Sequence, residues 1–186
     1  MKLHLNKSLT LVELLIAVCI FSLIVVGFSN IDTFSRYHVL SSDRRIKLQN
    51  DAAYVLEHMA KNISKAIGDA NQAAVDTSSG ISGDTAIKVW IDSNSNGKRD
   101  GSDIQIAYRY RGATDYQIWY YSDYVGSPGS YEVISRKISS FSGSLSDNYV
   151  LVEVGTCWNP AVACGSLDNL ALSMTNRIYM PSVSTN

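Results

Sequence analysis

The chain has 186 residues, with 16 Lys and Arg against 17 Asp and Glu, and its formal net charge is −1. From residue 70 onward, eight basic residues stand against eleven acidic ones. This balance lacks the clustered cations that neutralise phosphates, so composition argues against a nucleic-acid-binding protein. The length allows one modest domain in addition to an N-terminal apolar segment.

The first informative element is an apolar run over residues 9–28, which reads LTLVELLIAVCIFSLIVVGF. As a helix, a run of about 20 residues rises roughly 30 Å, enough to cross the hydrocarbon core of a bilayer. Glu13 is the single charged residue in the run. An ionised carboxylate is costly inside a membrane, so we expect Glu13 to have a task within a low-dielectric assembly.

The eight residues before this run, MKLHLNKS, contain two lysines and end in the small residue Ser8. Such a segment is typical of a short cleaved leader, which we place at residues 1–8. Cleavage after Ser8 would create a new α-amino group on Leu9, one helical turn before Glu13. Opposite charges at this separation attract strongly where the dielectric constant is low. We therefore expect the Glu13 carboxylate to pair with the Leu9 amine of the same or a neighbouring subunit.

Residues 8–14, SLTLVEL, resemble the processing motif of type IV prepilins and type II secretion pseudopilins. In that family, a membrane-embedded prepilin peptidase cuts just before the apolar segment and methylates the new N-terminus. By position, Ser8 precedes the cut, Leu9 becomes the N-methylated first residue, and Glu13 is the assembly carboxylate. Ser8 stands where the family usually has Gly, and Leu9 stands where Phe or Met is commoner.

The resemblance implies a bacterial inner-membrane protein with a cytoplasmic N-terminus and a periplasmic head, which later enters a pilus or pseudopilus. Its implied partners are prepilin peptidase, other pilin or pseudopilin subunits and an inner-membrane assembly platform, and no nucleic acid is expected. The alternatives for the N-terminal segment are an ordinary secretory signal and an uncleaved single-pass anchor. A secretory signal fits less well, because its apolar core is usually about 7–15 residues long.

Residues 29–68 are predicted to continue the helix as an amphipathic stalk. This stretch contains no proline, and from about Ile46 its apolar residues recur at spacings of three and four. Gly68 is expected near the C-terminal stop of the helix. A helix over residues 9–67 would be about 90 Å long. Its second half must pack on a head domain, because its apolar stripe needs cover.

Residues 69–186 are predicted to form an antiparallel β head. After a polar loop over residues 70–83, the apolar period changes to two. The predicted strands cover residues 87–91, 104–110, 116–121, 131–138, 149–155 and 167–180. Short turns between them indicate an antiparallel sheet that lays one face on the helix. The expected class is therefore α+β, which is also the pilin-like architecture that the resemblance implies.

Two further stretches sharpen the resemblance. Residues 48–68, LQNDAAYVLEHMAKNISKAIG, and the final strand ending at Asn176-Arg177 are similar to PilW-like minor pilins and J-type pseudopilins. This likeness implies a minor subunit near a filament tip, and a major repeating subunit is the alternative. The sequence does not separate a type IV pilus from a type II secretion system.

One loop has the spacing of a calcium site. In residues 92–103, oxygen side chains occupy loop positions one, three, five, nine and twelve, namely Asp92, Asn94, Asn96, Asp100 and Asp103. Gly97 stands at position six, where a calcium loop turns sharply, and Lys98 at position seven would offer its backbone carbonyl. Asp at position twelve resembles the dockerin variant and predicts weaker binding than an EF-hand. The alternative is a hairpin loop that is rich in turn-forming residues.

Cys157 and Cys164 flank a loop-like stretch with Asn159-Pro160 at its centre. No further Cys or His lies nearby to complete a zinc site. In an exported head, a disulfide is the favoured interpretation. It would close a short loop and contribute roughly 2–3 kcal/mol in the chain-entropy model. Cys19 lies in the apolar run and is expected to be a small buried hydrophobe.

No enzyme is expected, because the chain shows no phosphate-binding glycine loop, HExxH motif or nucleophile elbow. His4 lies in the leader, and His38 and His58 lie on the stalk, where we expect no catalytic partner. An aromatic cluster between residues 116 and 124 could bind a sugar or a surface, and ordinary packing on two sheet faces is the alternative. Its members are Tyr116, Trp119, Tyr120, Tyr121 and Tyr124. The rival function is therefore a tip-displayed adhesin.

Overall fold

The computed structural model describes residues 10–68, 72–112, 114–146 and 148–180. The chain divides into two compact units, Met1–Ser42 and Asp43–Asn186. One helix, α1 (Leu11–Ile63), contributes to both units. The division falls within the predicted stalk, and the predicted leader (residues 1–8) lies outside the described residues.

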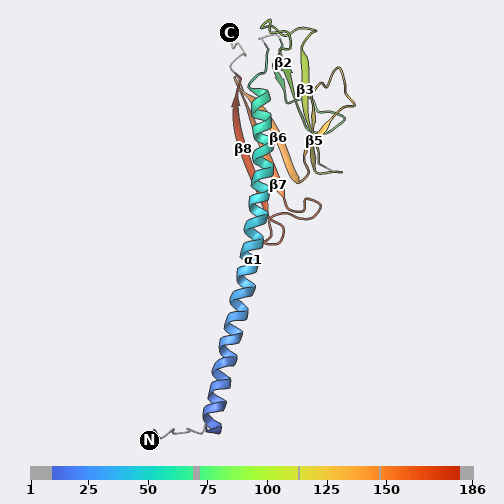
Figure 1. Ribbon diagram of the computed structural model, residues 1–186. Helices are drawn as coiled ribbons and strands as arrows, with labels where there is room; N and C mark the ends of the chain where they lie inside the picture. Colours follow the sequence, from blue (N-terminus) through green and yellow to red (C-terminus); the bar gives the residue numbers. More distant parts are fainter. Residues whose placement is uncertain (1–9, 69–71, 113, 147, 181–186) are drawn as a thin grey trace. The chain divides into compact units, whose positions relative to one another are not determined.

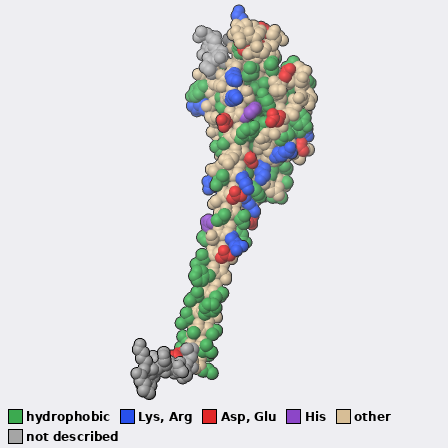
Figure 2. Space-filling view, viewed as in Figure 1, with side chains coloured by type: hydrophobic (Ala, Val, Ile, Leu, Met, Phe, Trp, Pro, Cys, Tyr) green, Lys and Arg blue, Asp and Glu red, His purple; other side chains and the backbone are tan. Residues whose placement is uncertain are grey.

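In the first unit, α1 exposes its apolar side chains on all sides. The large apolar residues from Leu11 to Leu40 are between 45% and 79% exposed, and Figure 2 shows the hydrophobic side chains along this part of the helix. No charged residue occurs between Glu13 and Asp32. The helix is long and apolar enough to cross a membrane, which agrees with the sequence-based expectation.

Three hydroxyl groups in this unit, those of Ser22, Ser29 and Thr33, donate within the helix itself. Ser22 Oγ donates to the Val18 carbonyl at 2.8 Å, and Ser29 Oγ donates to the Val25 carbonyl at 2.9 Å. Thr33 Oγ1 makes the same bond to the Ser29 carbonyl at 2.9 Å. These bonds to the carbonyl four residues earlier let polar side chains sit in an apolar helix without an unpaired donor.

The second unit contains two antiparallel sheets (Figure 1). The five-stranded sheet has the order β1 (Val75–Asp76), β2 (Ala86–Ile91), β3 (Ile104–Arg111), β4 (Gln117–Tyr121) and β5 (Glu132–Ser135). The three-stranded sheet has the order β6 (Ile138–Ser146), β7 (Tyr149–Cys157) and β8 (Ala171–Tyr179). Every pair of neighbours is antiparallel, so the α+β class holds for the described residues.

One core joins the C-terminal part of α1 to both sheets. The helix buries residues at spacings of three and four, which places them on one face: Leu48, Ala52, Val55, Leu56, Met59 and Ile63. Most of them contact a cluster that contains Ile87 and Tyr108 of the first sheet and Val152 of the second. Each fully buried large aliphatic side chain contributes about 1.5–3 kcal/mol, so this face holds the head together.

The head differs from the sequence-based expectation in having two sheets where one was expected. Residues 131–138 were expected to form one strand, but β5 ends at Ser135 and β6 begins at Ile138 in the other sheet. Strand β6 reads ISSFSGSLS, and only Ile138 and Phe141 are buried in it. Its serines and glycine have weak strand propensity, which is why the alternation was not recognised.

The helix also ends earlier than expected. Residues up to 67 were expected to be helical, but α1 stops at Ile63. Ala66 instead forms a bridge with Ile91, and the Ile67 amide donates to the Trp90 carbonyl at 2.9 Å. These residues cover the edge of β2, and strand pairing replaces the last helical turn.

Candidate functional site

The start of α1 is closed by a reciprocal capping box between Thr10 and Glu13. Glu13 Oε2 accepts hydrogen bonds from the Thr10 amide at 2.9 Å and from Thr10 Oγ1 at 2.8 Å. In return, Thr10 Oγ1 accepts the Glu13 amide at 3.3 Å. Two amides that the helix itself cannot satisfy thereby find partners, and the carboxylate lies at the positive end of the helix dipole. The Thr-x-x-Glu spacing of residues 10–13 is the sequence signal for this box, which was not among the predicted features.

The box gives Glu13 a partner within its own chain. All of its described hydrogen bonds use Oε2, so within residues 10–68 Oε1 accepts none. Ser8 and Leu9 lie outside the described residues. Cleavage between them and the pairing of Glu13 with the Leu9 amine therefore stay predictions. Cleavage there would leave the Thr10 amide and hydroxyl, and with them the box, intact.

The exposed apolar surface of the first unit continues beyond the predicted membrane span at residues 9–28. Ile31 is 65% exposed, Phe34 and Tyr37 are 66% exposed, and Leu40 is 54% exposed. Among them Arg36 forms an exposed ion pair with Asp32 at 2.9 Å. A surface that mixes charged pairs with large apolar side chains is unsuited to lipid and suited to contact with other protein chains.

The residues of the predicted calcium loop lie between β2 and β3 and are held by hydrogen bonds among themselves. Asp92 Oδ2 accepts the Gly97 amide at 2.9 Å, and Asp103 Oδ2 accepts the Asp100 amide at 2.7 Å. Asp100 Oδ2 accepts Asn96 Nδ2 at 2.6 Å. Bonds from the Ser102 amide and from Asn96 hold the pKa of Asp100 below its ordinary value.

The same loop shows the sharp turn that its sequence predicts, since Gly97 has a φ of 75°. Asn94 Oδ1 accepts the Asn96 amide at 3.0 Å, and Asn96 Oδ1 accepts the Lys98 amide at 2.8 Å. Across the described ranges, no group of three or more His, Cys, Asp or Glu residues is placed to hold a metal ion. These internal bonds agree with the turn-forming alternative, and calcium binding stays a prediction.

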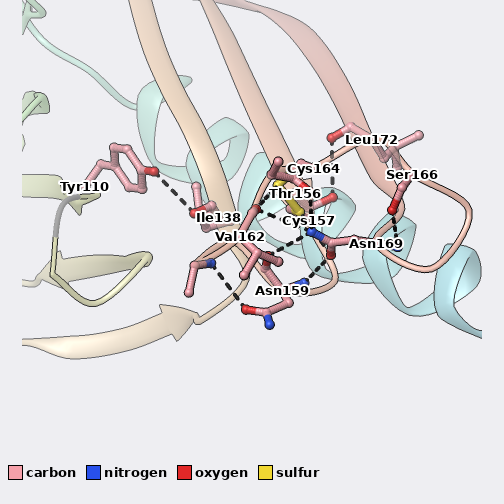
Figure 3. Close-up of a disulfide and its surroundings, with 12 residues drawn as sticks. Tyr110, Ile138, Thr156, Cys157, Asn159, Val162, Cys164, Ser166, Asn169 and Leu172 are labelled. Carbon is pink, nitrogen blue, oxygen red and sulfur yellow. Dashed lines mark hydrogen bonds between the residues drawn. A yellow bond between two sulfur atoms is a disulfide. The ribbon is translucent and has the colours of Figure 1, made fainter.

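The predicted disulfide between Cys157 and Cys164 is present (Figure 3). Asn169, which is only 7% exposed, lies inside the loop. Its Nδ2 donates to the carbonyls of Asn159 at 3.0 Å and Ala163 at 2.9 Å, and its Oδ1 accepts the Asn159 amide at 2.7 Å. One buried amide side chain thus satisfies several backbone groups of the loop that no strand partner pairs.

The disulfide loop is also fastened to the helix. Arg44 Nη1 donates to the Asp168 carbonyl at 2.9 Å. The Lys137 ammonium lies 3.4 Å from the centroid of the Trp158 ring, and the Arg44 guanidinium carbon lies 5.2 Å from the ring centroid. These cation–π contacts tie the loop to α1 and to Lys137, the residue that precedes β6.

His58 has polar partners that sequence reasoning did not anticipate. Its Nδ1 lies 2.9 Å from Tyr108 Oη, and Asn62 Nδ2 donates to the same oxygen at 2.8 Å. The pKa of His58 is lowered overall. Burial is the main cause, the Glu132 carboxylate opposes it, and the Lys61 ammonium adds to it. Burial also raises the pKa of Tyr108. The network joins α1 to β3. His58 and Asn62 lie one helical turn apart, but Tyr108 is 50 residues from His58 in the sequence, so no local pattern indicates the contact.

The aromatic cluster divides between two faces of the five-stranded sheet. Tyr120 faces the helix, where its ring lies 4.7 Å from His58 and 5.2 Å from Tyr108. On the other face, Trp119 stacks on Tyr131 with centroids 3.8 Å apart. The arrangement matches the packing alternative, because most rings contact one another. The remaining predicted members are Tyr116, Tyr121, which is 2% exposed, and Tyr124, which packs edge-on to Tyr121.

Comparison of the chain with protein-family models, with curated proteins and with solved structures yields no match. The likeness to pilins and pseudopilins therefore rests on the sequence itself, chiefly on residues 8–14 and 48–68.

Proposed function

We propose that this chain is a minor pilin or pseudopilin, a structural subunit of a type IV pilus or a type II secretion pseudopilus that prepilin peptidase processes. The observation that carries the proposal is the start of α1. There, a capped carboxylate, Glu13, opens a helix whose large apolar side chains are at least 45% exposed as far as Leu40. Such a surface requires cover, and neighbouring helices of a filament provide it.

The mechanism is mechanical and electrostatic. Before assembly, lipid covers the apolar part of α1, and the capping box lowers the cost of keeping Glu13 near the membrane. During assembly, the helix leaves the bilayer and packs among other subunits. Glu13 then offers Oε1 to the Leu9 amine of a neighbouring subunit, which sets the offset between the two chains. The subunit itself performs no chemical reaction.

The head domain suits an extracytoplasmic location. Its Cys157–Cys164 disulfide persists in an oxidising compartment such as the bacterial periplasm. The favoured topology has a cytoplasmic N-terminus and an inner-membrane helix, with the head in the periplasm and later on the filament. The alternative of a tip adhesin gains no support from the aromatic cluster, because its rings are largely engaged with one another.

The proposal is tested by expressing the chain with a complete filament assembly system, with and without active prepilin peptidase. Filaments are sheared from the cells and probed for this chain. We expect it in the sheared fraction only when the peptidase is active. Recovery of the chain entirely in the membrane fraction, while the other subunits form filaments, would contradict the proposal.

A further inference from the structure

A groove of about 690 Å³ lies between the free edges of the two sheets. One wall is the segment around β1, the other is the C-terminal half of β6, and outward side chains of the first sheet line its side. The lining residues include Val75, Thr77, Trp90, Arg99, Gly143 and Leu145. This volume falls in the range of about 300–1,000 Å³ that is typical of ligand sites.

The β6 wall presents unpaired backbone groups to this groove. At the end of β7, the Cys157 amide donates to the Lys137 carbonyl on the β6 side, and the amide of Trp158, the next residue, donates to the Leu170 carbonyl on the β8 side. The N–H and C=O groups of successive residues in a strand point to alternate sides. Those of Leu151 therefore point toward its β6 partner Ser144. The N–H and C=O groups of Gly143 and Leu145 therefore point away from β7. Among the residues that the structure describes, neither has a backbone hydrogen-bond partner there.

The β1 wall offers a second free edge. The Trp90 amide donates to the Ala74 carbonyl at 3.0 Å, so Ala74 faces β2 and the backbone of Val75 faces the groove. Within the described ranges, no hydrogen bond occupies the outward backbone groups of Val75. The groove is thus bordered by strand edges on both sides, an arrangement that fits an added strand.

Gly143 brings the two walls together at one end of the groove. A Cβ atom at this position would collide with the Ile87 side chain and would lie 3.5 Å from Thr77 Cγ2. Absence of a side chain therefore allows β6 to approach the first sheet closely at this point. Leu145, two residues further along β6, also lines the groove and is 44% exposed.

Arg99 places a positive charge beside these edges. Its guanidinium carbon lies 4.1 Å from the Trp90 ring centroid, and its Nη1 donates to the Ala73 carbonyl at 2.8 Å. Arg99 makes no ion pair within the described residues. The carboxylate of Asp76, which also lines the groove, is already occupied by Ser78 and Ser79. The fixed guanidinium thus retains donors for an incoming anion.

We propose that this groove binds an extended segment of a partner protein, which adds a strand to the edge of β6 and places an acidic side chain on Arg99. The alternating outward groups of Gly143 and Leu145 match the backbone repeat of a strand. The guanidinium, stacked on Trp90, matches a carboxylate. The site goes beyond filament packing, since it recruits a second protein to the head.

The test uses the full chain in detergent micelles and fluorescein-labelled hexapeptides of alternating Val and Thr, with one Asp at each position in turn. Binding is followed by fluorescence anisotropy. We expect at least one peptide to bind, and the same peptide N-methylated at alternate amides to bind at least about tenfold more weakly, because its strand pairing is blocked. Equal binding of the methylated peptide, or no binding by any peptide of the set, would overturn the proposal.

Two chain variants locate the site. Arg99→Gln should weaken binding of the best Asp-containing peptide about tenfold, because it removes the positive charge alone. It should leave unchanged the binding of the same peptide with Asn in place of Asp. Leu145→Pro should weaken both peptides because it removes one outward N–H, whereas Leu145→Ala should not. If Arg99→Gln affects the binding of neither peptide, the assignment fails.

The chain itself could also occupy the groove. Two results would identify it as the occupant and overturn the proposal: peptide binding that appears only after removal of residues 181–186, or dimerisation in place of peptide binding.

Discussion

Thr10 and Glu13 hold the first turn of α1 closed, each side chain accepting the backbone amide of the other. This relationship gives Glu13 a role that does not depend on any neighbouring chain, namely helix capping. It also leaves Oε1 for a second role. The two roles are separable by substitution, because capping needs an acceptor oxygen whereas pairing with an amine needs a charge.

Glu13→Gln is expected to keep the capping box and to lose the ionic pair. The variant should be processed and inserted into the membrane like the wild type, but its incorporation into filaments should fall at least about tenfold, because an amide cannot neutralise an amine in a low-dielectric contact. Glu13→Val should be impaired in the same way. The measurement is the ratio of sheared to membrane-bound chain on immunoblots. Incorporation of Glu13→Gln at the wild-type level would refute the pairing mechanism.

The disulfide makes a prediction about head stability. Replacing both Cys157 and Cys164 by Ser should lower the free energy of unfolding by roughly 2–3 kcal/mol, because the unfolded chain regains the entropy of an open loop. Chemical denaturation in detergent, followed by tryptophan fluorescence, measures the change. Cys19→Ser is the matched control and should leave the transition where it is, since Cys19 forms no disulfide and is exposed in this chain, where the sequence had suggested a buried side chain. A double variant as stable as the wild type would show that Asn169 alone orders the loop.

Tyr108→Phe should destabilise the head by roughly 1–3 kcal/mol, because Asn62 and His58 each lose their hydrogen bond to the removed hydroxyl in a partly buried site. Tyr54→Phe serves as the control, since Tyr54 is 52% exposed. Chemical denaturation should show this loss of unfolding free energy for Tyr108→Phe and no loss for Tyr54→Phe. Equal curves would mean that solvent satisfies the network.

His58 predicts a specific pH dependence. Its pKa is lowered in the folded state relative to its ordinary value of about 6.5, so the unfolded chain binds the proton more tightly. The stability contribution is therefore fully present above about pH 6.5 and is lost as the pH falls below that value. Denaturation midpoints between pH 8 and pH 5 should fall more steeply for the wild type than for His58→Gln. Parallel curves would remove His58 as the titrating group.

Calcium binding by the loop at residues 92–103 is tested by thermal unfolding of the full chain with and without Ca²⁺. If the predicted site forms, we expect stabilisation at about 10⁻⁴–10⁻³ M Ca²⁺, as in extracellular modules, and little effect of Mg²⁺. Asp103→Asn should abolish the shift. An unfolding temperature that does not change with millimolar Ca²⁺ would leave the loop as a self-bonded turn.

The parts of the fold that could be predicted from sequence are those governed by local periodicity. The three-and-four spacing from Leu48 to Ile63 marks the buried face of α1, and the alternation in β2 and β3 marks those strands. The division into two sheets could not be predicted, because it depends on where β5 and β6 find partners far away in the chain. Serine-rich β6 gives little local signal of its own.

The candidate site was foreseeable to a similar extent. Glu13 stands out as a charge in an apolar run, and its Thr-x-x-Glu spacing also indicates a cap. The spacing of Cys157 and Cys164 favours a disulfide, which is present. The contact of His58 with Tyr108 and the groove beside Arg99 were not foreseeable, because both arise where elements distant in sequence meet.

In the proposed function, proteolysis exposes a cationic amine for Glu13 at the start of the apolar helix. The decisive measurement is the intact mass and N-terminal sequence of the native protein purified from filament-forming cells. We expect a chain that begins at Leu9 and carries an N-terminal methyl group. A native chain that still begins at Met1, or at any residue other than Leu9, would contradict it.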